Sequence, residues 1–146
     1  MVHKSISAYP LTWPDGWKRT LSPRVSNFRT SFTTARNGLV EEIDRLGGTN
    51  VILSSNVPVR LDGLPKANFA HPTDPGVAVY FNYKKKSMVF ACDRFSTVQD
   101  NVQAIRLTVA DLRGIERWGA SDMMERAFRG FQGHPAPPQW WESLRV

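Results

Sequence analysis

The chain has 146 residues, 41% of them hydrophobic, with 19 lysines and arginines against 13 aspartates and glutamates. This is the size of one domain, and the net charge of +6 favours polyanionic partners such as nucleic acid. Its single cysteine, Cys92, excludes an intrachain disulfide and a cysteine-based zinc cluster, which suits a reducing compartment. No run approaches the ~18 apolar residues of a membrane span, and the N-terminus lacks the apolar region of a signal peptide. We therefore expect a cytoplasmic protein that does not bind a membrane.

Residues 1–30 mix prolines with tryptophans. Pro10, Pro14 and Pro23 rule out a long helix, whereas Trp13 and Trp17 supply large apolar side chains. We expect an extended arm that packs its tryptophans on the core.

Residues 31–46 have the apolar spacing of a helix, with intervals of four, four and three between Ala35, Leu39, Ile43 and Leu46. Gly47-Gly48 follows the last apolar residue and is typical of a helix C-cap. The sequence predicts a first helix that ends at Leu46.

Several strands follow this helix. Residues 50–54 and 57–61 are short strand candidates, and Pro58 makes the second an edge strand or a bulged one. A loop over residues 62–76 leads into a hairpin of 77–83 and 88–92, whose second strand is so apolar that we expect it to be central. In the first hairpin strand, Val77, Val79, Phe81 and Tyr83 share one face, and Ala78, Tyr80 and Asn82 share the other.

A second helix is predicted after the hairpin. Ser96-Thr-Val-Gln99 fits a capping box, and apolar residues recur at helical spacing at Val98, Val102, Ile105, Val109 and Leu112. Gly114 is expected to end or loosen this helix. A turn at 118–119, a third helix capped by Ser121 and a linker-like stretch over 133–138 complete the chain.

This order of elements predicts an α+β fold, a sheet of three or four mainly antiparallel strands with helices packed on one face. The arm would cover residues 1–30, the α+β domain 31–132 and a C-terminal tail 133–146.

Five stretches stand out together, at residues 9–20, 50–65, 74–81, 90–95 and 113–119. They resemble an uncharacterised protein family of phages and plasmids, in which a region like this one precedes a C-terminal J domain, and the similarity extends over nearly the whole chain. Residues 140–146 (Trp-Trp-Glu-Ser-Leu-Arg-Val) look like the opening of such a J domain, and its helices are absent here. His134-Pro135 is followed by Ala136, so the His-Pro-Asp loop is missing and co-chaperone activity is not implied. The resemblance implies a mobile-element origin and no particular reaction.

Lys84, Lys85 and Lys86 fall at the predicted hairpin tip, where three ammonium groups would meet successive phosphates. A solvated turn that discourages edge aggregation is the alternative. Tyr80 and Tyr83 lie on opposite strand faces, so at most one of them is a stacking platform.

The segment 13–19 joins two tryptophans to Lys18 and Arg19, which suits a contact with single-stranded nucleic acid or a peptide groove. The alternative is a hydrophobic anchor for the arm.

Carboxylates flank the junction between the last strand and the second helix. Asp93 and Asp100, with Asp74 and Glu42, are the groups that a metal-dependent nuclease would need. However, Ala91-Cys92-Asp93 replaces the acid and lysine expected on the second strand of a restriction-type nuclease core. Capping and salt-bridge roles are the alternative.

Other catalytic or cofactor motifs lack support. His3, His71 and His134 lie far apart without ligands at fixed spacing, so no metal is expected. Ser54 and Ser55 lack a nucleophile elbow, and Gly47-Gly48 follows a helix rather than opening one, so no cofactor is expected either.

We therefore expect a non-enzymatic accessory protein of a mobile element that binds DNA or RNA through a basic surface. The candidate nucleic-acid-binding residues are Lys84, Lys85, Lys86, Arg60, Arg94, Lys18 and Arg19. The alternative is a protein-interaction module, an inhibitor or adaptor that acts on a host, phage or defence protein, and a metal-dependent nuclease ranks third.

Overall fold

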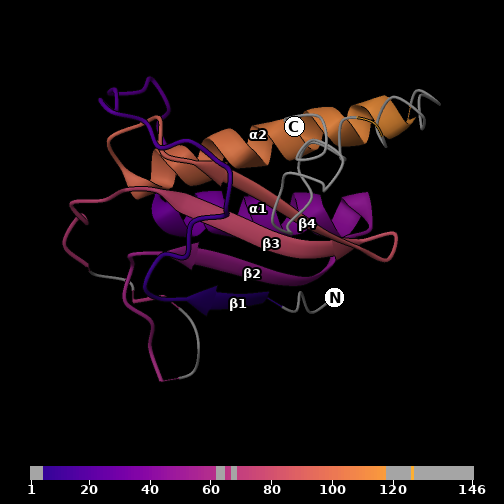
Figure 1. Cartoon of the computed structure of the whole chain (residues 1–146), viewed down its shortest axis with the longest axis horizontal. Coiled ribbons are helices and arrows are strands. Elements are labelled where there is room, and N and C mark those ends of the chain that lie inside the picture. The colour runs from indigo at the N-terminus through magenta and orange to yellow at the C-terminus, as the bar shows by residue number, and fades with distance from the viewer. Residues whose placement is uncertain (1–4, 62–64, 67–68, 118–125, 127–146) are drawn as a thin grey trace, which may run out of the picture.

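The computed structural model describes residues 5–61, 65–66, 69–117 and 126. The elements along these residues are β1 (Ser5–Ala8), α1 (Phe32–Leu46), β2 (Thr49–Ser55), β3 (Val77–Tyr83), β4 (Lys86–Cys92) and α2 (Val98–Arg117). The strands form one sheet in the order β1-β2-β3-β4, in which β1 runs parallel to β2 and the other neighbours are antiparallel. Both helices lie against the same face of this sheet (Figure 1). The predicted α+β class is confirmed.

The core lies between the sheet and the two helices. Alternation along β3 directs Val77, Val79, Phe81 and Tyr83 toward the helices, as predicted, and all four are buried. The helices fill the other side of this cluster with the predicted apolar stripes, among them Leu39, Ile43, Val102 and Val109. Full burial of each such side chain stabilises the fold by about 1.5–3 kcal/mol, so this layer supplies most of the driving force for folding.

Helix α1 ends at Leu46 as predicted, and it begins at Phe32, one residue after the start of the predicted range. The Ser31 hydroxyl accepts a hydrogen bond from the Thr34 N–H at 3.1 Å, which caps the first turn. Gly47 has a φ of 103°, and its N–H donates to the Ile43 carbonyl at 3.1 Å. A Cβ on Gly48 would lie 2.5 Å from the Ile43 side chain and 2.9 Å from Phe81. The first glycine therefore supplies the left-handed conformation, and the second allows close packing.

Helix α2 differs from its prediction at both ends. It begins at Val98, and Thr97 rather than Ser96 accepts the capping hydrogen bond from the Asp100 N–H at 3.4 Å. The helix also runs through Gly114 to Arg117. Beyond Leu112 the apolar stripe continues with Ile115, which packs against the core, so burial outweighs the ~1 kcal/mol that a helical glycine costs.

Three strand predictions are wrong. Residues 5–8 form β1, although they were expected to belong to an extended arm rather than to the sheet, while residues 57–61 contain only an isolated bridge from Val59 to Pro65. Pro58 has no N–H for a ladder, and β1 already occupies the free edge of β2. In addition, β4 is an edge strand rather than a central one. Met88 and Phe90 face the helices and belong to the core cluster, whereas Val89 is fully buried on the other face, so the apolar character of β4 reflects burial of both its faces.

Some predictions fall on residues that the structure does not describe. The 118–119 turn, the cap of the third helix at Ser121, the linker over 133–138 and the tail over 133–146 lie outside the described residues. Within the described part, neither helix combines the length and the apolar character that a membrane crossing requires.

The predicted role of the α2 stripe leads to a direct test. Val109 has no exposed surface, so its replacement by Asp would bury a carboxylate without a partner. We expect Val109→Asp to lower the free energy of unfolding by several kcal/mol, measured by urea denaturation. Leu107→Asp is the matched control, because Leu107 lies on the same helix and is 43% exposed. Its effect should stay within about 0.5 kcal/mol, and equal losses in both variants would contradict the packing of α2.

Candidate functional site

The segment after β1, residues 9–30, crosses the sheet on the face opposite the helices and is here called the arm (Figure 1). Three hydrogen bonds fix its first part to the sheet. The Leu11 N–H donates to Asn56 Oδ1 at 3.0 Å, and the Thr12 N–H donates to Ser54 Oγ at 2.7 Å. The Tyr80 hydroxyl donates to the Thr12 carbonyl at 2.7 Å. The arm thus runs from the β1 edge toward the β4 edge.

A buried carboxylate holds the arm at the β4 edge. Asp93 follows β4 directly, and its side chain is only 6% exposed. It accepts hydrogen bonds from Arg19 Nε at 2.8 Å and from the Thr20 N–H at 2.9 Å. Burial alone would raise the pKa of Asp93, but the hydrogen bonds from Thr20 and the Arg19 guanidinium outweigh it and lower the pKa.

Arg19 is itself shared between two carboxylates. Its second nitrogen pairs with Asp74, and the guanidinium lies 4.4 Å from the centre of the Trp13 ring. The hydrogen bond to Asp74 is the main reason that the pKa of Arg19 is raised. The positive charge of Arg19 is therefore already neutralised within the fold, and its role is to hold the arm.

The two arm tryptophans have different environments. Between them Gly16, with a φ of 83°, makes a turn closed by the Trp17 N–H and the Pro14 carbonyl at 3.4 Å. Trp13 donates its indole N–H to the Trp17 carbonyl at 2.8 Å and lies under Arg19. Trp13 thus supports the contacts of Arg19 and Thr20 with Asp93, which we call the anchor. Trp17 instead faces a groove at the β4 edge.

Beyond the anchor, the arm pairs with the turn between β4 and α2. The Arg24 N–H donates to the Arg94 carbonyl at 2.8 Å, and the Ser96 N–H donates to the Arg24 carbonyl at 2.9 Å. The Phe28 ring meets the edge of Phe95 at 5.5 Å between centroids. Arg24 and Arg94 are exposed neighbours, and Lys18 is exposed beside the anchored Arg19. We call Lys18, Arg24 and Arg94 the basic cluster.

Next to the basic cluster lies a groove of about 390 Å³ between the arm, β4 and α2. The arm contributes Trp17, β4 and the following turn contribute Phe90 and Phe95, and α2 contributes Ala104 and Thr108. Most of its lining is apolar, and Arg94 is the charged residue among those that line it. The groove therefore combines ring surfaces with a cation.

The groove also contains Cys92, whose thiol has low reactivity. Burial raises the pKa of the Cys92 thiol, which therefore stays protonated at neutral pH and is a weak nucleophile. Its sulfur lies 3.3 Å from Asn101 Oδ1. The groove is consequently suited to binding rather than to thiolate chemistry.

The turn that carries Arg94 and Phe95 is held by Asn101, which is fully buried. Its amide nitrogen donates to the carbonyls of Pro75 and Phe95 at 2.9 and 3.0 Å, and its oxygen accepts from the Phe95 N–H at 2.9 Å. Asn101 thus has a structural role.

Of the predicted acids, Asp74 and Asp93 are brought together, with Arg19 between them. Glu42 instead accepts from Arg113 Nε at 2.9 Å, and Asp100 is buried in the first turn of α2. Among the described residues, no three His, Cys, Asp or Glu side chains are grouped as a metal site would require. His71 is exposed and contacts the Phe69 ring, while His3 and His134 lie outside the described residues.

The predicted lysine tip is a two-residue turn. Lys84 and Lys85 have φ values of 48° and 65°, the left-handed conformation of a tight hairpin. Lys84 Nζ lies 3.9 Å from Glu116 Oε2 and 5.3 Å from the centre of the Tyr83 ring. Lys86 is exposed at the start of β4. Tyr83 is buried, whereas Tyr80 is half-buried with its hydroxyl bonded to the arm.

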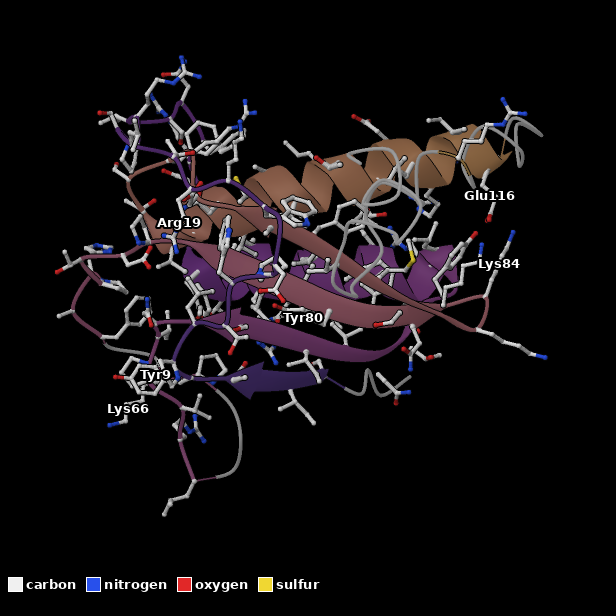
Figure 2. All side chains as sticks on the ribbon, viewed as in Figure 1. Tyr9, Arg19, Lys66, Tyr80, Lys84 and Glu116 are labelled. Carbon is white, nitrogen blue, oxygen red and sulfur yellow. The ribbon has the colours of Figure 1, made fainter. Side chains whose placement is uncertain are left out.

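The structure does not bring the seven predicted basic residues onto one surface. Figure 2 shows Lys84 and Glu116 at the opposite end of the sheet from Arg19. Along β4 the separation from Lys86 to Arg94 is roughly 25 Å at ~3.3 Å per residue. Arg60 lies in the loop after β2, in which the Lys66 N–H donates to the Pro58 carbonyl at 2.9 Å, and Figure 2 shows Lys66 on the β1 side of the sheet. Only Lys18, Arg19 and Arg94 are brought together.

Sequence reasoning missed Arg24 and the groove. Arg24 stands in an irregular stretch, and nothing local indicates that it pairs with residues 94–96. The groove needs Trp17, Phe95 and Ala104, which come from three separate segments. Their meeting depends on the path of the arm.

Comparison of the chain with protein-family models, with curated proteins and with solved structures finds no match.

The Asp93 anchor predicts a pH dependence of stability. Its pKa is lower folded than the ~3.9 of an unfolded aspartate, so its contribution is complete above about pH 5 and is lost as the pH falls below 4. We expect Asp93→Asn to be less stable than wild type by about 1–3 kcal/mol at pH 7, with a smaller difference near pH 3. Urea denaturation at both pH values measures this. Asp111→Asn is the control because Asp111 is exposed, and a difference that does not shrink with acid would contradict the anchor.

The hairpin turn gives a second prediction. Non-glycine residues in the left-handed conformation are strained, and Asn-Gly is favoured in such turns. Replacing Lys84 with Asn and Lys85 with Gly should raise the free energy of unfolding by about 1 kcal/mol, although the half-exposed pair with Glu116 is lost. Thermal denaturation measures the change. A lower melting temperature would show that the Glu116 contact outweighs the turn strain.

Proposed function

We propose that this protein binds nucleic acid through the basic cluster and the adjoining groove. The observation that carries the proposal is the convergence of Lys18, Arg24 and Arg94 beside aromatic residues at one edge of the sheet. Cations beside accessible rings are the combination that contacts phosphates and bases together, and Trp17 and Phe95 are half-buried beside this cluster. Electrostatic attraction would first bring the nucleic acid to this surface, because the chain has a net charge of +6.

The choice of this surface over the lysine tip rests on the partners of each cation. Among the described residues no carboxylate pairs with Lys18, Arg24 or Arg94. Arg19 is shared by two carboxylates, and Lys84 lies near Glu116. Cations without an internal partner have more to gain from a phosphate. The tip retains Lys85 and Lys86, but its nearest ring, Tyr83, is buried.

The resemblance to mobile-element proteins gives this binding a setting. In that setting we propose a non-enzymatic accessory role, in which the protein holds DNA or RNA during events carried out by other proteins. The protonated Cys92 thiol and the neutralised Asp74 and Asp93 carboxylates support binding rather than hydrolysis at this edge.

A protein-interaction role is the second candidate, and one observation favours it. On the arm, Leu21 is 98% exposed and Val25 is 87% exposed. Apolar side chains this exposed on one short segment are suited to contact with a partner. Because Arg24 lies between them, an acidic partner with an apolar surface would fit.

Salt dependence tests the proposed binding. If the basic cluster meets three phosphates, replacing Lys18, Arg24 and Arg94 with Gln should reduce the slope of log affinity against log salt by about two units on single strands. On duplex DNA the reduction would be up to about three units. Fluorescence anisotropy with labelled oligonucleotides between ~50 and ~200 mM salt gives both slopes.

The Lys84→Asn, Lys85→Gly variant is the matched control, because it removes two lysines without harming the turn. Its slope should equal that of wild type. A reduced slope in this variant alone would move the contact to the hairpin tip. Wild-type protein that binds neither DNA nor RNA at ~50 mM salt would refute the proposal. In that case, a protein partner that binds wild type in a pulldown but not the Leu21→Ser, Val25→Ser double variant would favour the protein-interaction role.

A further inference from the structure

We propose that the groove at the β4 edge receives one unpaired nucleobase, so that the protein prefers single-stranded over duplex nucleic acid. This inference rests on the proposed nucleic-acid binding and specifies what the groove recognises. The occupant is an unstacked base whose flanking phosphates meet the basic cluster.

The lining of the groove fits a flat, mainly apolar group. Trp17 and Phe95 are half-buried and supply ring surfaces, Phe90 is buried at the base of the groove, and the small side chains of Ala91 and Ala104 leave the space open between them. The volume of about 390 Å³ lies within the range of small-ligand sites, 300–1,000 Å³. A stacked base needs aromatic surface of this kind and no particular hydrogen-bond donor, because every base has a π-face.

The cations beside the groove indicate that its occupant carries negative charge. Arg94 lines the groove, and Arg24 is tied to it through the 2.8 Å hydrogen bond from its N–H to the Arg94 carbonyl. Lys18 directly follows Trp17 in the chain. An occupant therefore needs both a planar apolar part and negative charge beside it. A nucleotide unit of a single strand has both, whereas a base in a duplex is already stacked and paired.

The groove is also preformed rather than assembled on binding. The anchor of Arg19 and Thr20 on Asp93 fixes the arm on one side, and the hydrogen bonds of Asn101 fix the turn that carries Phe95 on the other. A preformed site loses less conformational entropy when its ligand binds.

The decisive probe is a single strand that lacks bases. We would compare a 12-nucleotide oligo-thymidine, an abasic strand of equal length and charge, and a 12-base-pair duplex by fluorescence anisotropy at one salt concentration. Wild-type protein should bind oligo-thymidine about tenfold or more tightly than the abasic strand, the gain expected from one stacked base.

Two variants locate this preference in the groove. Trp17→Ala removes a ring from the lining, and Ala104→Leu fills the space without adding a ring. Both should bring oligo-thymidine binding down to that of the abasic strand while the salt slope stays unchanged, because the basic cluster is intact. Tyr9→Ala is the matched control, since Tyr9 is an arm aromatic, 56% exposed, outside the groove.

The outcomes separate this inference from the proposed function. Equal binding of oligo-thymidine and the abasic strand by wild type would overturn the base-binding groove and leave phosphate binding in place. A preference that survives in folded Ala104→Leu would also overturn it, whatever the stability of Trp17→Ala. No binding of any strand at ~50 mM salt would refute both. Binding of an acidic tyrosine-containing peptide instead would assign the groove to a protein partner.

Discussion

The carboxylate of Asp93 is the contact on which the functional surface depends. It is buried at the end of β4, and it accepts hydrogen bonds from Arg19 and Thr20, which are more than 70 residues away in the chain. A buried carboxylate without such partners would be strongly unfavourable, so the anchor is required for the arm and for Asp93 alike. With the arm fixed there, Trp17 and Lys18 are placed beside Arg94.

The sheet shows why an arm can take this position. Its helix-facing side is filled by the apolar cluster with α1 and α2, whereas its other side carries smaller or more polar groups such as Ser54, Ala78 and Tyr80. The arm crosses that side with polar contacts to Ser54, Asn56 and Tyr80 rather than with a second apolar layer. The apolar core therefore lies on one face of the sheet, and the groove lies at the β4 edge.

The division between anchoring and available charges has a functional consequence. Arg19, Arg36 and Lys84 have partners within the fold, and Arg36 donates to Ser5, Ser7 and Asn37 to hold β1 against α1. Arg36 is only 8% exposed, so this cation is part of the interior, and burial lowers its pKa. The basic cluster, in contrast to these anchored residues, is exposed. Net charge alone therefore overstates the number of cations that a polyanion can reach.

The sequence by itself determined the elements whose signals are local. The apolar spacing of α1 and α2, the Gly47 cap and the alternation along β3 all depend on neighbours close in the chain. Tertiary structure decided what depends on distant segments. Four-residue β1 is stable only beside β2, the apolar strand β4 lies at the edge of the sheet, and Arg24 joins Arg94 through backbone pairing that no side-chain pattern encodes. The groove belongs to this second group, because its three walls meet only after the arm has crossed the sheet.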